Sequence, residues 1–389
     1  MVVPELVVKA IKSVQSAVKK GSYNDWVTMS VVDRPAGPSL VVSHVWFQGE
    51  VRFEIPLEEE PARDMSGSHR LQCSTLEEAL RVVKANDVPA ADGGGHMEMS
   101  ASEDQVLLQS ARSKIKLQKL VAAEYKSQNW ADLDLATGVD IPAGELAAIM
   151  KLALVFGGSG DGNEEMDFLL WDDNGIMKTD GEMCGFIDRR YALPHPNMAV
   201  WLNPKYPAAF LAVIPSADVV EFVYDYEAVK FEYEGPDLTA RLYLRTGNLN
   251  YRELHKLFGA VESTDCIAVD GDEVQTRVSQ IAGVSESEVV ELSWSRSTLE
   301  DSPLLYVKAG GQLGGPSSAD AVATLDLLPD NVAGSQWRRA VQAKVFAKAL
   351  KVFHKMGEVK ICVVADRRHP ALGIMLPSGK LEAFVKYLG

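Results

Sequence analysis

Long apolar runs are missing from this 389-residue sequence. A membrane-spanning helix needs roughly 18 or more consecutive apolar residues, and no stretch of the chain approaches that length. The opening segment, MVVPELVVKAIKSV, carries Glu5 and Lys9 among its apolar residues, so it lacks the uninterrupted apolar core of a signal peptide. These absences predict a cytoplasmic protein with no membrane partner.

Cysteine is also scarce, and the four cysteines lie far apart at Cys73, Cys184, Cys266 and Cys362. No two of them form a CxxC pair, and no histidine stands at zinc-ligand spacing from any of them. We therefore expect four reduced, buried thiols, as is usual for a cytosolic protein, and no metal site.

Signatures of catalysis are missing as well. The glycine-rich VFGGSGDGNEE lacks the GK[ST] of a phosphate-binding loop and follows a helical pattern, so we interpret it as a flexible loop. Asp132 and Asp134 could bind a metal, but a domain linker explains them better. No serine or cysteine in a nucleophile context stands near the isolated histidines His195, His255 and His354. We expect no catalytic residue and no cofactor; an α+β enzyme whose active site assembles from distant residues is the alternative.

A repeat is the clearest feature that the sequence does contain. Near the end of each third, a helical pattern precedes three alternating strands, and these helices are expected at residues 75–86, 204–214 and 342–355. Each third also opens with a helical pattern, at residues 4–20, 142–156 and 271–282. A spacing of about 120–140 residues is too long for a solenoid and indicates domain duplication.

The repeat predicts an α+β fold of three tandem domains, at residues 1–134, 135–260 and 261–389. The boundaries fall near residues 128–138 and 258–265. Each unit must bury one face of an antiparallel sheet under its helices. Edge strands of adjacent units could then pair, which would give long sheets that cross the domain borders.

Positive charge is concentrated on the expected helices, although the net charge of the chain is −15. The last helix carries Lys344, Lys348, Lys351 and Lys355 at steps of four, three and four, which places them on one helical face. We call these four residues the lysine stripe. The full set of candidate DNA-binding residues is Lys9, Lys12, Lys19, Lys20, Arg81, Lys84, Arg112, Lys114, Lys151, Lys205, Arg277, Lys344, Lys348, Lys351 and Lys355.

A solvated helix face explains any one of these groups by itself. Two features favour a functional interpretation: lysine-only stripes are unexpected in an acidic chain, and they fall on equivalent helices of the repeat. Acidic residues gather elsewhere, in segments 58–60, 161–167 and 285–291. A basic surface of this kind contacts phosphates without sequence preference.

Four segments resemble, in order, motifs of a known family: KIKLQKLVAAEYKSQNWADLD, GIMKTDGEMCGF, RLYLRTGNLNYRELHKLF and ADRRHPALGIMLPSGKLEAFVKYLG. The family is the bacterial β sliding clamp, the processivity subunit of the replicative DNA polymerase and a member of the DNA clamp superfamily. The chain departs from the family pattern where Glu182, Met183 and Cys184 replace His-Arg-Leu, and where it ends in Tyr387-Leu388-Gly389. These departures suit a divergent clamp, such as a phage-encoded one.

The resemblance implies a head-to-tail homodimer that forms a six-domain ring around double-stranded DNA, with helices inside and antiparallel sheets outside. The implied partners are a DNA polymerase, a clamp loader and other clients that bind through short linear motifs. The alternatives are a non-encircling interaction protein built from clamp-like domains and a virion structural protein.

A pocket for client peptides is expected between the second and third domains. The Thr179-Asp180-Gly181 turn, the loop from His369 to Leu372 and the apolar C-terminal end suggest it from the sequence, because glycine allows close approach of a partner backbone. With the residues that the resemblance adds, the candidate pocket is Met150, Leu154, Thr179, Gly181, Cys184, Leu254, His369, Pro370, Ala371, Leu372, Tyr387 and Leu388.

Overall fold

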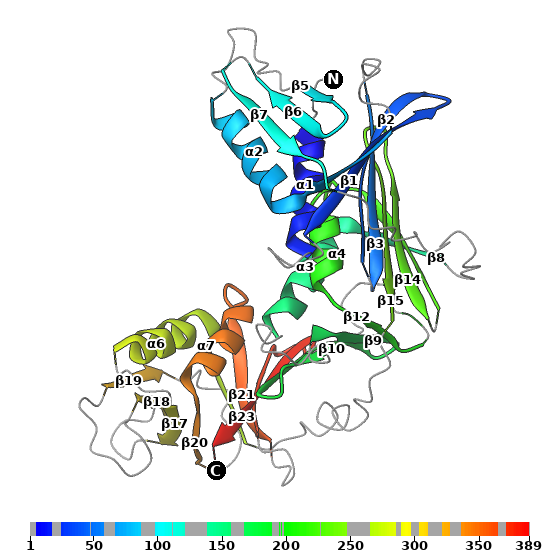
Figure 1. Cartoon of the computed structure of the whole chain (residues 1–389). Coiled ribbons are helices and arrows are strands. Elements are labelled where there is room, and N and C mark those ends of the chain that lie inside the picture. The colour runs from blue at the N-terminus through cyan, green and yellow to red at the C-terminus, as the bar shows by residue number, and fades with distance from the viewer. Residues whose placement is uncertain are drawn as a thin grey trace. The chain divides into compact units, whose positions relative to one another are not determined.

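The computed structural model describes residues 5–17, 25–46, 48–57, 67–86, 98–110, 112–120, 138–156, 167–188, 194, 196, 198–225, 227–246, 265–284, 289–296, 303–309, 321–326, 336–364 and 371–388 (Figure 1). The chain divides into two compact units, Met1–Met150 with Leu202–Gly247, and Lys151–Trp201 with Asn248–Gly389. No helix within the described ranges is long and apolar enough to cross a membrane. The expected domain boundaries near 128–138 and 258–265 lie almost entirely outside these ranges.

One order of elements repeats along the chain: a strand, a helix and three antiparallel strands. The first unit begins with the helix and three strands of one such repeat, which are α1 (Glu5–Ala17), β1 (Trp26–Arg34), β2 (Gly37–Trp46) and β3 (Gly49–Pro56). A full repeat follows as β4 (Ser68–Gln72), α2 (Cys73–Asn86), β5 (Glu98–Ala101), β6 (Gln105–Gln109) and β7 (Lys114–Gln118). The unit also contains β8 (Gly138–Pro142), most of α3 (Ala143–Val155), α4 (Lys205–Leu211), β13 (Val219–Tyr224), β14 (Ala228–Glu234) and β15 (Thr239–Arg245).

The second unit contains the remaining repeats. Its strands from the middle of the chain are β9 (Leu169–Asp172), β10 (Gly175–Thr179), β11 (Met183–Asp188) and β12 (Val200–Leu202). They are followed by β16 (Cys266–Asp270), α6 (Gly271–Val284), β17 (Val289–Arg296), β18 (Pro303–Ala309) and β19 (Ala321–Asp326). The last repeat is β20 (Arg338–Gln342), α7 (Ala343–Val352), β21 (Glu358–Val364), β22 (Ala371–Met375) and β23 (Leu381–Leu388). The six helices expected from the sequence are confirmed. The three strands expected after the second helix of each third are confirmed too, as β5–β7 after α2, β13–β15 after α4 and β21–β23 after α7.

Strands that are distant in sequence complete the sheets, as expected. In the first unit, eight strands run in the order β4-β1-β2-β3-β15-β14-β13-β8, and β3 pairs with β15 so that Phe53 lies opposite Ala240. In the second unit, β11 pairs with β23 within a twelve-stranded sheet. The strands β5, β6 and β7 form a separate antiparallel sheet. The two long sheets therefore join the first third of the chain to the second, and the second third to the last.

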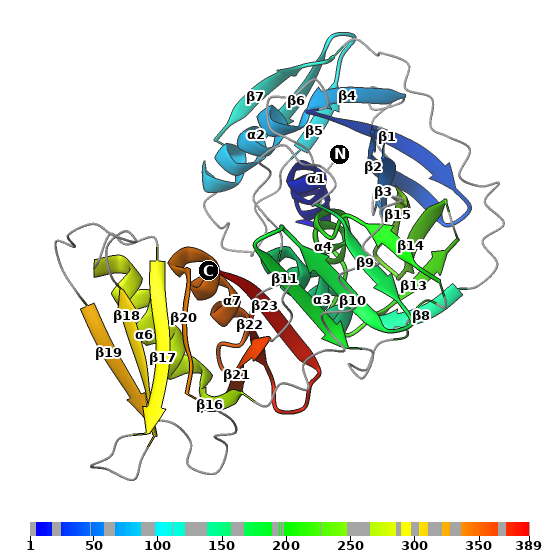
Figure 2. The ribbon, with the colours of Figure 1, turned by 90° about the horizontal axis from the view of Figure 1, so that it is seen from below.

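Helices cover one face of the first sheet. Val7, Ile11 and Val14 lie one turn apart on α1 and are fully buried, while the intervening Lys9 and Lys12 are exposed. Figures 1 and 2 show α1 beside α4, where Ser13 donates a hydrogen bond of 2.6 Å to the carbonyl of Ala209. Each fully buried side chain of this size contributes about 1.5–3 kcal/mol, so the amphipathic pattern fixes the side of the sheet on which the helices lie.

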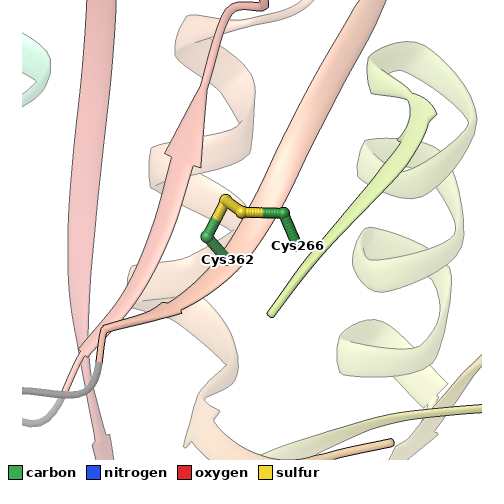
Figure 3. Close-up of a disulfide and its surroundings, with 2 residues drawn as sticks. All are labelled: Cys266 and Cys362. Carbon is green, nitrogen blue, oxygen red and sulfur yellow. A yellow bond between two sulfur atoms is a disulfide. The ribbon is translucent and has the colours of Figure 1, made fainter. Parts of the chain in front are cut away.

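The prediction of four reduced thiols is wrong for two of the cysteines. Cys266 on β16 and Cys362 on β21 face each other directly and form a disulfide, with their Cα atoms 4.1 Å apart (Figure 3). The two residues are 96 positions apart, and only the antiparallel register brings them together. Cys73 and Cys184 are free and buried, as expected. Burial raises the pKa of the Cys73 thiol to about 12.

His44 is a titratable side chain in the interior of the first unit. Its ring packs between Trp26, at 4.6 Å between ring centroids, and Trp46, at 5.4 Å. The pKa of His44 is lowered to about 4, mainly by burial and also by the nearby positive charge of Arg70, while a backbone hydrogen bond at Trp26 and the charge of Asp25 oppose the shift. The folded protein therefore holds this imidazole in its neutral form at neutral pH.

We expect His44→Phe to make stability less sensitive to acid. The folded-state pKa of about 4 lies below the value of about 6.5 in an unfolded chain, so stability is lost as the pH falls from 6.5 through 4. The variant lacks this group, and its free energy of unfolding should gain up to about 3 kcal/mol relative to the parent between pH 7 and pH 4. Urea unfolding at the two pH values measures the difference, and parallel losses in both proteins would contradict it.

Candidate functional site

The turn between β10 and β11, residues 180–182, is fixed by side-chain hydrogen bonds to its backbone. Asp180 Oδ1 accepts from the amides of Glu182, at 3.1 Å, and Met183, at 2.8 Å. Thr179 Oγ1 donates to the carbonyl of Met183 and accepts from the amide of Gly181. Gly181 has a φ of 89°, a backbone conformation that favours glycine. The tight turn expected from Thr-Asp-Gly is confirmed, and Gly181 is exposed at its tip.

An apolar cluster lies beside this turn, on one face of the long sheet of the second unit. Its members are buried side chains of the central and last thirds of the chain: Leu170, Met177, Cys184, Phe186, Trp201, Val364, Ala371 and Phe384, with the partly buried Phe168 packed against them. We call this set the apolar cluster. The pairing of β11 with β23 places Cys184 directly opposite Phe384, which joins the two halves of the cluster.

The structure brings some of the candidate pocket residues together at this place. Thr179 pairs with Cys184 in the β10–β11 hairpin, and both are buried. Ala371 belongs to the same cluster. The neighbouring Leu372 points to the opposite face, because successive side chains of a strand alternate, and it is fully buried there opposite Val385.

The remaining candidate pocket residues differ in burial and in position. Met150 is fully buried in α3, whereas Leu154, one turn later, is 39% exposed. Tyr387 and Leu388 extend β23, and their backbone pairs with β20 opposite Val341 and Ala340. Leu254, His369 and Pro370 lie outside the described residues. The sequence did not predict three members of the apolar cluster: Phe384, Trp201 and Met177. The alternation in KLEAFVKYL indicates a buried Phe384, but no local pattern identifies the strand that it faces.

The lysine stripe lies on and just beyond α7, which packs on β20 and β23 (Figure 2). Lys344 and Lys351 are exposed, and Phe346, Ala349 and Leu350 on the other side of the helix are buried, as expected. The expectation that the helix reaches residue 355 is wrong, because α7 ends at Val352. Lys355 has a φ of 64° in the following turn, where its amide donates to Asp272 Oδ1.

Lys348 is the member of the stripe that is engaged by a carboxylate. Its ammonium lies 3.6 Å from Asp180 Oδ2, and the two side chains are 37% and 15% exposed. Lys178 on β10, which interacts electrostatically with both Asp180 and Lys348, is only 4% exposed. The pKa of Lys178 is lowered to about 8, mainly by burial and also by the charge of Lys348, while Asp167 and Asp180 oppose the shift.

The other candidate basic residues are spread over the helices. All six helices among the described residues carry at least one exposed basic side chain. These exposed residues are Lys9 and Lys12 on α1, Arg81 on α2, Lys151 on α3, Lys205 on α4, Arg277 on α6, and Lys344 and Lys351 on α7. Arg112 and Lys114, at the start of β7, are exposed too. Lys19 and Lys20 lie outside the described residues, as does the side chain of Lys84.

Comparison with known proteins defines the fold. No model of a protein family and no curated protein matches the sequence. Solved structures do match it, over nearly the whole chain, and their common fold is that of a bacterial DNA sliding clamp. The resemblance seen in the sequence is therefore confirmed at the level of the fold, as is the expected combination of helices with antiparallel sheets.

Three solved clamps illustrate the match. The β subunit of DNA polymerase III from Thermotoga maritima has a TM-score of 0.78 at 12% identity, over 99% of this chain and 97% of that one. The clamp from Pseudomonas aeruginosa bound to griselimycin has a TM-score of 0.75 at 14% identity, again over 99% and 97%. The Helicobacter pylori β clamp bound to a DNA ligase peptide has a TM-score of 0.70 at 12% identity, over 98% and 97%.

Proposed function

We propose that the protein is a DNA sliding clamp, a non-enzymatic ring that encircles double-stranded DNA and holds a replicative DNA polymerase on it. The observation that carries the proposal is the match to sliding clamps over 99% of the chain. Exposed basic residues on every described helix support it, since they occur in a chain whose net charge is −15. Such residues attract the phosphate backbone without reading sequence.

Ring closure requires contacts between two chains. We propose three domains, at residues 1–134, 135–260 and 261–389, and a head-to-tail homodimer in which domain 1 of one chain meets domain 3 of the other. Within the described residues, β7 pairs only with β6 and β19 only with β18, so each leaves one edge open. An open edge invites pairing with another strand, and heterologous contacts form a ring when the rotation closes.

The proposed partners follow from this role. They are a DNA polymerase, a clamp loader that opens the ring, and further clients that bind through short motifs, as the H. pylori clamp binds a DNA ligase peptide. We place the protein in the bacterial cytoplasm, on the nucleoid or in a phage-infected cell. The disulfide between Cys266 and Cys362 is the feature least typical of that compartment.

Topological holding is the first test of the proposal. When a linear duplex incubated with the protein is ligated into a circle and washed at high salt, the protein should stay on the circles, because salt screens phosphate contacts but does not open a ring. Cutting the circles with a restriction enzyme should release it. Gel filtration measures the bound fraction, and light scattering should give twice the mass of the chain. Equal retention on linear and circular DNA, or a monomer at micromolar concentration, would indicate a non-encircling protein.

The lysine stripe is expected to contribute to electrostatic attraction of DNA. Replacing the exposed pair, Lys344→Glu with Lys351→Glu, should weaken binding to a linear duplex. If each lysine neutralises one phosphate, the slope of log affinity against log salt should fall by about 2. Fluorescence anisotropy of a labelled duplex measures both quantities. Lys360→Glu with Lys386→Glu, on strands of the sheet, is the matched control and should behave as the parent; an unchanged slope in the stripe variant would remove α7 from the DNA surface.

The client pocket is proposed at the apolar cluster and the neighbouring 180–182 turn. Griselimycin, which the P. aeruginosa clamp binds, is the probe. Leu154→Ala removes an exposed apolar side chain of the candidate pocket, and it should weaken griselimycin binding about tenfold, as expected for an apolar anchor. Val219→Ala is the matched control, because Val219 is 49% exposed on β13 of the first unit. Calorimetry compares them, and equal affinities would place the pocket elsewhere.

A further inference from the structure

Lys348 differs from the other lysines of the stripe. Lys344, Lys351 and Lys355 are exposed, whereas Lys348 is partly buried and lies 3.6 Å from the carboxylate of Asp180. The pair joins α7 to the 180–182 turn, two parts of the second unit that are separated by more than 160 positions in the sequence. A lysine held by a carboxylate must give up that contact before it can neutralise a phosphate.

The two carboxylate oxygens of Asp180 make different contacts. Oδ1 accepts the amides of Glu182 and Met183 and so shapes the turn, while Oδ2 faces the Lys348 ammonium. With an oxygen engaged on each side, the carboxylate cannot rotate without losing a contact. Interactions of a carboxylate with a cation are stronger than those between neutral groups, and the limited exposure of Asp180, at 15%, reduces screening by solvent.

The 180–182 turn also sets the position of the residues that we propose to contact clients. The carbonyl of Glu182 accepts the amide of Lys386, which ties the turn to β23. Directly after the turn, Met183 begins the strand that places Cys184 against Phe384 in the apolar cluster. Lys178, which is buried on β10, interacts electrostatically with Asp180, Asp167 and Lys348. A shift of the Asp180 carboxylate would therefore change the backbone at the edge of the candidate pocket.

We propose that Lys348 is a positioning residue for client binding and not a DNA contact: its ion pair with Asp180 holds the 180–182 turn in the conformation that clients recognise. This inference rests on the proposed clamp function. It divides the lysine stripe by role, with Lys344 and Lys351 facing DNA and Lys348 supporting the pocket. The division depends on the contact of Lys348 with Asp180.

Lys348→Gln tests the proposal in the full-length protein, with Lys344→Gln as the matched control on the same helix. A partly exposed pair of this kind is worth up to about 1 kcal/mol, which corresponds to roughly threefold to fivefold in an equilibrium. Lys348→Gln should accelerate hydrogen exchange at the amides of Glu182 and Met183 and weaken griselimycin binding by about that factor. Its affinity for a linear DNA duplex should match the parent. Lys344→Gln should show the reverse pattern.

A double-mutant cycle separates the ion pair from a general loss of structure. Asp180→Asn keeps an oxygen for the two amides but removes the charge, so adding it to Lys348→Gln should cost little more griselimycin affinity. The parent's advantage over Lys348→Gln should also shrink at 1 M salt, where exposed charges are screened within about 3 Å. A side chain that only fills space would show neither effect.

The outcomes separate failure of the proposed client pocket from failure of the positioning role of Lys348. Parent protein that fails to bind griselimycin would remove the proposed pocket, and with it this inference. Parent protein that binds, together with a Lys348→Gln variant of equal griselimycin affinity and unchanged amide exchange, would overturn the positioning role alone. A Lys348→Gln variant that loses DNA affinity as Lys344→Gln does would return Lys348 to the DNA surface.

Discussion

The pairing of β11 with β23 is the interaction on which the candidate site depends. Five residues of each strand face one another, from Met183 opposite Val385 to Ile187 opposite Leu381, although the strands are nearly 200 positions apart. Each buried amide or carbonyl left without a partner would cost about 1–3 kcal/mol, so the ladder fixes the register closely. A shift by one residue would turn Cys184 and Phe384 to opposite faces and break up the apolar cluster.

One consequence of this register is a row of residues that crosses the sheet on a single face. Cys266 lies opposite Cys362, Cys362 opposite Gly373, Gly373 opposite Phe384, and Phe384 opposite Cys184. The absence of a side chain at Gly373 leaves room for the Phe384 ring, which a Cβ atom there would meet at 3.3 Å. The disulfide and the apolar cluster are thus two ends of one cross-strand row, and the same hydrogen-bond ladders hold both in place.

The sequence was sufficient for the described helices and for the three strands that follow the second helix of each third, but not for the neighbours of these elements. Local periodicity predicted all six described helices, because a pattern such as Val7, Ile11 and Val14 needs no knowledge of distant residues. The end of α7 was misplaced, since the lysine spacing continues to Lys355 although the backbone turns away after Val352. The disulfide, the cluster partners of Cys184 and the contact of Lys348 were all missed for one reason. The disulfide, the contact of Cys184 with Phe384 and the contact of Lys348 with Asp180 each join segments that lie 90 or more positions apart, and no local pattern encodes their register.

The roles of the four charged residues in the lysine stripe also could not be predicted from local spacing, and this affects the proposed function. Spacing alone makes the four lysines of the stripe equivalent, and in an acidic chain it favours one common role for them. Tertiary packing makes them different, because α7 lies on β20 and β23, next to the strand that leads out of the 180–182 turn. From that position Lys348 reaches Asp180, while Lys344 and Lys351 keep their charges in solvent. One helix thus carries the two exposed lysines that we propose to attract DNA and the lysine that contacts the 180–182 turn, so the difference between them is a property of the fold and not of composition.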